Sequence, residues 1–159
     1  MKVILLKKLL LGFLLLSLIS SCKEEILYEN NLSIKNGKWD RAESAVFTFE
    51  VEDTINRYSL YLNVRHAGDY PYKNLYLFTK TISPNGKLAL DTAQMIFANS
   101  KGQWMGKGIG DIYDYQFKFK KEILFPEKGE YKFQIEQAMR ERVLTSITDV
   151  GIQIEKVEK

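Results

Sequence analysis

The sequence predicts an all-β fold, namely an antiparallel two-sheet β-sandwich of about eight strands. In several segments apolar side chains recur at every second position, which gives a strand one apolar and one polar face. Turn residues, chiefly glycine and asparagine, separate these segments. A helical pattern is confined to residues 136–144 and would make about two turns. We therefore expect at most one short helix and no helical crossovers.

Each alternating segment defines its own apolar side. Residues 46–51 alternate cleanly, and so do residues 58–64, whereas residues 75–79 alternate less clearly, as expected of a strand covered on both faces. Three later segments, at residues 113–119, 131–135 and 150–154, follow the same rule. The side chains expected in the core are Phe47, Phe49, Leu60, Leu62, Phe117, Phe133 and Ile152.

Turn signals lie between the strands at Asn36-Gly37, residues 67–69, Asn85-Gly86 and Lys128-Gly129. Asparagine followed by glycine suits a type I′ turn, in which both central residues have positive φ. Asn85-Gly86 is the best candidate for a tight hairpin because alternating segments flank it.

The N-terminal residues have the order of a secretory signal peptide. Lys2, Lys7 and Lys8 precede an apolar run, and two serines then precede Cys22. The run is shorter than the roughly 20 residues of a membrane span. A cysteine directly after small residues resembles a bacterial lipoprotein signal, which implies that Cys22 is acylated, palmitate included. The alternatives are a plain signal peptide with an incidental cysteine and a buried helix. We assign residues 1–21 to the signal peptide, 22–30 to a lipidated tether and 31–159 to the sandwich.

Charge and cysteine content exclude several functions. The full chain has 23 Lys and Arg against 20 Asp and Glu, and removal of residues 1–21 takes away three lysines, leaving 20 of each (23 − 3 = 20). A neutral domain offers no electrostatic reason to bind nucleic acid. Cys22 is the single cysteine, so its acylation would leave no thiol for a disulfide, a metal or catalysis. We expect no cofactor and no small-molecule ligand.

Three features invite a catalytic or ligand-binding interpretation. Residues 106–111 are rich in glycine, but an aromatic strand follows them where a phosphate loop needs a helix, so a bend close to a neighbouring strand is the better interpretation. His66 is the only histidine, without partners for zinc or a triad, and is expected at a strand end. Asp111 and Asp114 lack the alternating acidic loop of a calcium site. We expect no catalytic residue and no metal.

Aromatic side chains near loops are the candidate partner-binding residues. Trp39, Tyr70, Tyr72 and Trp104 lie beside turn signals, where exposed rings would anchor a protein or stack on a sugar. The alternative is that these rings fill the core. Arg140 is a further candidate, because arginine is common among interface residues that dominate binding energy.

Several segments together resemble the gliding motility lipoprotein GldH family of the Bacteroidota. The resemblance spans nearly the whole chain and rests on the order of Cys22, Trp39, residues 70–75, 106–111, 125–126, 129–131, 139–140 and 150–152. It implies an outer-membrane lipoprotein needed for gliding and linked to type IX secretion, and it supplies no catalytic residues. The leaflet, periplasmic or surface, stays open.

Two functions therefore remain as hypotheses. The first is a non-enzymatic component or assembly factor of the gliding and secretion apparatus, anchored by Cys22 and bound to other envelope proteins. The second is a carbohydrate-binding surface lipoprotein of a polysaccharide uptake system.

Overall fold

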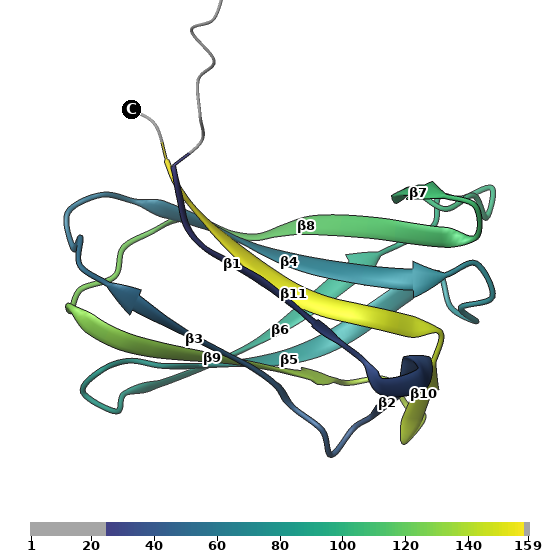
Figure 1. The fold of residues 1–159 in the computed structure, drawn as a ribbon, viewed down its shortest axis with the longest axis horizontal. Coiled ribbons are helices and arrows are strands. Elements are labelled where there is room, and N and C mark those ends of the chain that lie inside the picture. The colour runs from purple at the N-terminus through teal and green to yellow at the C-terminus, as the bar shows by residue number, and fades with distance from the viewer. Residues whose placement is uncertain (1–24, 158–159) are drawn as a thin grey trace, which may run out of the picture.

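Two antiparallel sheets face one another across an apolar core in the computed structural model, which describes residues 25–157 (Figure 1). The all-β sandwich expected from the alternating pattern is confirmed. The expected signal peptide, Cys22 and the first residues of the tether lie outside the described residues.

The first sheet has five strands in the order β1-β11-β4-β8-β7, each antiparallel to its neighbours. Its strands are β1 (Ile26–Ser33), β11 (Ile147–Lys156), β4 (Tyr58–Ala67), β8 (Ile112–Ile123) and β7 (Lys107–Ile109). β1 begins inside the segment assigned to the tether, so the folded domain starts before residue 31.

The second sheet has four strands in the order β3-β9-β5-β6. They are β3 (Ala45–Val51), β9 (Gly129–Gln137), β5 (Asn74–Ile82) and β6 (Leu88–Ile96). A short ribbon of β2 (Lys38–Asp40) and β10 (Val143–Thr145) closes one end of the sandwich, next to the 3-10 turn η2 (Lys35–Gly37). The described residues thus form eleven strands, against about eight expected. The three additional strands, β2, β7 and β10, have three residues each and are too short to show alternation in sequence.

Residues 136–144, where we expected at most one short helix, are not helical. This segment forms the end of β9, a turn and the start of β10. The buried Gln137 side chain donates through Nε2 to the carbonyl oxygens of Glu141 (2.9 Å) and Arg142 (3.1 Å), which fixes the turn. Leu144 is then buried opposite Trp39. Tertiary burial overrides the weak helical pattern here.

The core contains the side chains that the alternation selected. Phe47, Phe49, Leu60, Leu62, Phe133 and Ile152 are buried, as expected. Phe117 is only half-buried, but it packs against the core from the expected side of β8. Its partial exposure follows from its place near the edge, because only the short β7 lies beyond β8 in the sheet.

The hairpin expected at Asn85-Gly86 is present between β5 and β6, but its loop is longer than the two-residue type I′ turn that we expected. Ile82 pairs with Leu88, which leaves residues 83–87 as the loop. Gly86 has a φ of 82°, but Asn85 is not among the residues with positive φ. Asn85 instead accepts hydrogen bonds at Oδ1 from Ser83 Oγ (2.8 Å) and from the backbone of Lys87 (2.9 Å). The asparagine therefore stabilises a longer loop.

The glycine-rich stretch is a close approach of two strands, as expected. A Cβ at Gly108 would lie 1.8 Å from the backbone oxygen of Ile112, and one at Gly106 would lie 2.8 Å from that of Asp114. Gly110 has a φ of 68° in the turn between β7 and β8. The glycines thus allow β7 to fold back on β8.

Candidate functional site

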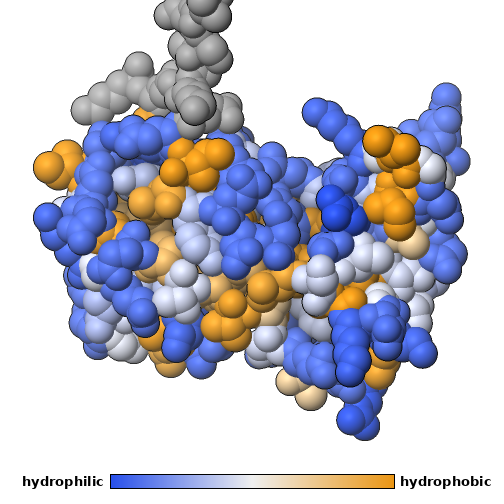
Figure 2. Space-filling model, in the orientation of Figure 1, coloured by the Kyte–Doolittle hydropathy of each residue, from blue (hydrophilic) through white to orange (hydrophobic). Residues whose placement is uncertain are grey.

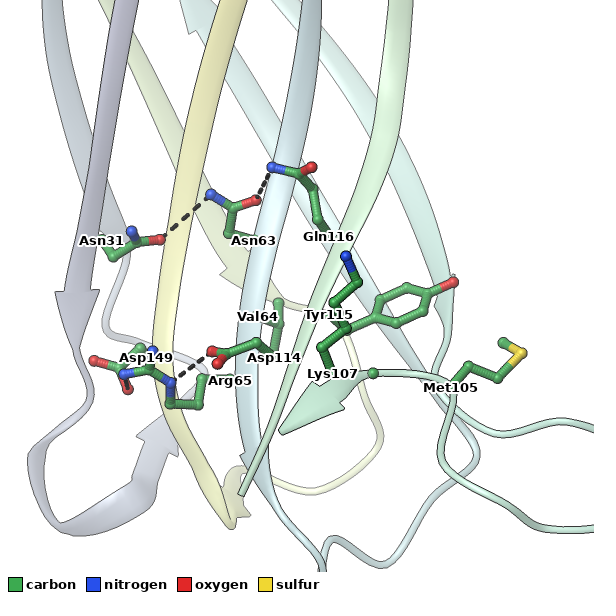
Figure 3. Close-up of a pocket in the computed structure, with 11 residues that line it drawn as sticks. Asn31, Asn63, Val64, Arg65, Met105, Lys107, Asp114, Tyr115, Gln116 and Asp149 are labelled. Carbon is green, nitrogen blue, oxygen red and sulfur yellow. Dashed lines mark hydrogen bonds and ion pairs between the residues drawn. The ribbon is translucent and has the colours of Figure 1, made fainter. Parts of the chain in front are cut away.

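A cleft of about 560 Å³ lies on the outer face of the five-stranded sheet. Figure 2 shows the surface hollowed beside the lobe that carries β7, and Figure 3 shows the side chains that line the hollow. They come from β1, β4, β7, β8, β11 and the segment before β7. The charged and amide side chains among them are Asn31, Asn63, Arg65, Lys107, Asp114, Gln116 and Asp149.

Strand register arranges these side chains in two rows across the sheet. One row is made of amides, because Asn31 pairs with Gly151, Gly151 with Asn63 and Asn63 with Gln116. The neighbouring row is charged, because Asp149 pairs with Arg65, Arg65 with Asp114 and Asp114 with Lys107. Residues two apart on a strand share a face, so both rows face the cleft.

The amide row forms one connected hydrogen-bond network (Figure 3). Gln116 donates through Nε2 to Asn63 Oδ1 (3.0 Å) and to Gln153 Oε1 (2.9 Å), while Asn63 donates to Asn31 Oδ1 (3.5 Å). Gln153 in turn donates to the carboxylate of Glu155. Such a network holds the amide groups in fixed orientations and leaves a pre-organised polar surface.

Gly151 makes room for this network at the floor of the cleft. A Cβ at this position would lie 1.9 Å from Asn31 Oδ1 and 2.6 Å from the backbone oxygen of Asn30. The missing side chain lets Asn31 reach over β11 toward Asn63. The φ of Gly151 is not positive, so its backbone conformation does not require glycine. Glycine is required here because β1 approaches β11 closely at this position.

The charged row is balanced. Arg65 Nε lies 2.6 Å from Asp114 Oδ1, and Arg65 Nη1 lies 3.5 Å from Asp149 Oδ2. The hydrogen bond to Asp114, with the charges of both carboxylates, raises the pKa of Arg65 above its ordinary value. With Lys107, the row has two cations and two anions. The charged row therefore carries no net formal charge.

An aromatic layer supports the cleft from the inner side of β4. His66 is buried, and its ring lies 4.6 Å from Trp104, 4.8 Å from Phe97 and 5.5 Å from Tyr113, measured between ring centroids. Its Nδ1 lies 2.9 Å from the carbonyl oxygen of Ala67, and its Nε2 is buried without a partner. Burial lowers the pKa of His66, so the ring is neutral at pH 7.

Two of the candidate partner-binding residues are core residues. Trp39 is completely buried and donates through Nε1 to the carbonyl oxygen of Glu43 (2.8 Å). Tyr70 is also buried; its hydroxyl donates to the carbonyl oxygen of Asn74 (3.0 Å), and burial raises its pKa. Each ring fills the core while its polar atom bonds to nearby backbone. Neither presents a ring to a partner, which corrects the expectation for both.

The other three candidates remain accessible, but they do not form one patch with the cleft. Tyr72 is half-buried, and a hydrogen bond to the Glu141 carboxylate raises its pKa. Arg140 is exposed in the turn after β9. Trp104 is half-buried against His66, and it directly precedes Met105, which lines the cleft. Among the three, Trp104 is therefore the one beside the cleft.

Sequence reasoning missed the cleft although its residues were visible in the pattern. Asn63, Arg65, Asp114 and Gln116 occupy the polar positions of two alternating segments, which usually indicate a solvated face. The same alternation places His66 in phase with Leu62 and Val64, which was the available signal for its burial.

The four-stranded sheet presents a contrasting outer face. Several large apolar side chains on β5 and the edge strand β6 are exposed, with Leu90 at 74%. The others are Tyr76, Phe78, Leu88 and Ile96. Apolar patches of this kind often mark interaction surfaces.

Within residues 25–157, no three His, Cys, Asp or Glu side chains gather in a way that could hold a metal ion. Asp114 instead pairs with Arg65, and the backbone oxygen of Asp111 accepts from Gly68 N (2.8 Å). The helices of this described range include none that is long and apolar enough to span a membrane.

Comparison with known proteins places the chain in a family. A family model described as GldH lipoprotein matches residues 26–154. The chain belongs to the GldH lipoprotein family. A relative named gliding motility lipoprotein GldH homolog, from Christiangramia forsetii, is 36% identical and covers 87% of this chain and 89% of its own length. Gliding motility lipoprotein GldH of Flavobacterium johnsoniae is 34% identical, covering 91% and 95% respectively.

Solved structures share only the general architecture with this GldH-family chain. One is a carbohydrate-binding module from a family 9 glycoside hydrolase of Ruminococcus flavefaciens, with a TM-score of 0.43 and 10% sequence identity. The match covers 82% of this chain and 98% of that module. The family assignment rests on the family model and the two GldH relatives.

Proposed function

We propose that this lipoprotein is a non-enzymatic component or assembly factor of the gliding and type IX secretion apparatus at the outer membrane. Acylated Cys22 anchors it, and other envelope proteins bind its folded domain. The supporting observation is that relatives named for gliding motility share about a third of their residues with it over nearly the whole chain.

The cleft of the five-stranded sheet is the docking surface in this proposal. Its amide side chains hydrogen-bond to one another, and Arg65 pairs with Asp114 and Asp149. These side chains are therefore pre-positioned, so that a partner could bind them with little rearrangement. A neutral polar segment of another envelope protein fits this chemistry. Trp104, beside the rim, contributes apolar contact area.

The test compares substitutions in the cleft with one on the opposite sheet. Asn63→Ala and Gln116→Ala disrupt the amide row, whereas Thr48→Ala changes an exposed residue of β3 and is the control. We expect the cleft variants to remain folded and membrane-bound, to lose gliding and secretion, and to lose co-purification of motility proteins through a C-terminal tag. Normal gliding by a folded double variant would exclude the cleft as the docking surface.

The remaining accessible candidates have their own test. Tyr72→Ala and Arg140→Ala change side chains in the loops at the end of the sandwich formed by residues 70–72 and 138–142. A loss of gliding in these variants, with an intact cleft, would place the docking surface at that end instead.

A second function, carbohydrate binding for a polysaccharide uptake system, is favoured by one feature of the cleft. Its floor is a row of side-chain amides, and hydroxylated neutral ligands are recognised by such donors and acceptors. Calorimetric titration of the purified lipoprotein with soluble polysaccharides tests it. Saturable heat that Asn63→Ala abolishes, together with uptake proteins in the pull-down, would favour this function over the first.

A further inference from the structure

The acyl anchor proposed above places one end of the sandwich next to the membrane. Cys22 and Ile26, the first residue of β1, are four residues apart (26 − 22 = 4). A fully extended chain spans about 3.3–3.6 Å per residue, so Ile26 lies within about 14 Å of the acylated residue. With Cys22 acylated, the start of β1 is therefore held close to the bilayer surface.

The loop between β3 and β4 belongs to the same end. Lys156, the last residue of β11, lies with its Nζ 2.8 Å from Glu25 Oε2 and 4.0 Å from Asp53 Oδ2. Its backbone N–H donates to the carbonyl oxygen of Glu25 (2.9 Å), and Val157 donates to that of Arg57 (2.8 Å). In Figure 1 the start of β1, the end of β11 and the loop after β3 lie toward one end of the sandwich.

This loop holds an apolar side chain outward in a fixed turn. Asp53 Oδ1 accepts from the backbone N–H of Ile55 (2.9 Å) and of Asn56 (3.1 Å), and Asp53 Oδ2 accepts from Asn56 Nδ2 (2.6 Å). The Ile55 side chain that the turn presents is 83% exposed. A large aliphatic residue so exposed on an ordered loop is unfavourable in water and favourable at a lipid interface.

Two further exposed apolar side chains lie at this end. Ile26 opens β1 and is 46% exposed, and Leu124, 47% exposed, follows Ile123, which pairs with Tyr58 at the start of β4. Arg57 connects the two loops, because its Nη1 donates to the carbonyl oxygen of Glu122 (2.9 Å). The three side chains thus come from separate segments held to one another.

We propose that Ile26, Ile55 and Leu124 form a membrane seat that lies in the lipid headgroup region of the bilayer anchored by Cys22. The seat gives the folded domain a defined orientation at the bilayer. Arg65 is seven residues beyond Tyr58 along β4 (65 − 58 = 7), so at about 3.3 Å per residue Arg65 in the cleft lies about 23 Å along the strand from Tyr58, which borders the seat. Partners would then reach the cleft without competing with lipid.

Another apolar side chain supplies the matched control. Ile109 is the last residue of β7 and is 94% exposed. It lies by the start of the twelve-residue strand β8, whose other end carries Ile123, so about 35 Å separates it from the seat. Ile109 is thus at least as exposed as Ile55 but far from the anchor.

The experiment uses the acylated full chain with a single introduced thiol. Ile55→Cys, Leu124→Cys and the control Ile109→Cys are each labelled with an environment-sensitive fluorophore, since acylation occupies Cys22. The proteins are reconstituted into vesicles of phosphatidylethanolamine and phosphatidylglycerol. We expect a blue shift and quenching by brominated lipid at positions 55 and 124, and neither at position 109.

The outcomes separate this proposal from the anchor itself. Intact mass showing an unmodified Cys22 would overturn both. An acylated protein that floats with vesicles while the labels at 55 and 124 stay in water would overturn the seat alone. Equal shifts at 55 and 109 would also overturn it, because they would show non-specific lipid contact.

Discussion

Replacement of Gly151 by alanine tests whether the floor of the cleft depends on a missing side chain. The new Cβ would lie 1.9 Å from Asn31 Oδ1 and 2.6 Å from the backbone oxygen of Asn30. Both distances are shorter than any normal contact, so the Asn31 side chain and the backbone of β1 must both move. The substitution should therefore disrupt both the pairing of β1 with β11 and the hydrogen bonds of the amide row.

The expected loss of stability follows from two opposing effects. Overpacking a closely approached site costs about 1–3 kcal/mol. Alanine recovers about 0.4–1 kcal/mol by restricting the unfolded chain, since Gly151 does not need positive φ. We expect a net decrease of about 1–2 kcal/mol in the free energy of unfolding, measured by urea denaturation of the Cys22→Ala domain without its signal peptide.

A double variant identifies which contact dominates. Asn31→Ala removes the side-chain oxygen and alone costs about 0.5–1 kcal/mol, but it leaves the contact with the Asn30 backbone. Combined with Gly151→Ala, it should recover only part of the loss. Gly151→Ala with unchanged or higher stability would refute the argument, because it would show that β1 shifts without cost.

Three further predictions concern the core, the buried histidine and the anchor. Phe47→Ala, at a completely packed site, should lower the free energy of unfolding by about 3–5 kcal/mol, and a loss below about 1 kcal/mol would contradict the assigned core. Burial lowers the pKa of His66 from 6.5, so as pH falls the unfolded chain binds a proton before the folded chain does, and stability should decrease below about pH 6.5. In urea denaturation, His66→Phe should lack this part of the pH dependence. A profile of stability against pH that is unchanged in the variant would assign the dependence to other groups. Cys22→Ala should move the protein from the membrane to the soluble fraction without changing its circular dichroism, and retention in the membrane fraction would contradict anchoring by an acyl chain.

The sequence alone determined the features that depend on neighbouring residues. Period-2 alternation identified the faces of β3, β4, β8, β9 and β11, and it placed Phe47, Leu62 and Ile152 in the core. The hairpin between β5 and β6 and the close approach at Gly108 followed from turn residues and glycine in the same way. Such signals are local, because a strand shows its two faces within a few residues.

Tertiary structure decided everything that depends on register and on distant partners. Asn31 and Gln116 are 85 residues apart (116 − 31 = 85), and only the pairing of β1, β11, β4 and β8 aligns them in one row. Trp39 lies beside a turn in sequence, yet its pairing opposite Leu144 buries it. A polar residue on a strand looks the same in sequence whether its face is a flat surface or a cleft, because the neighbouring strands set the shape of that face.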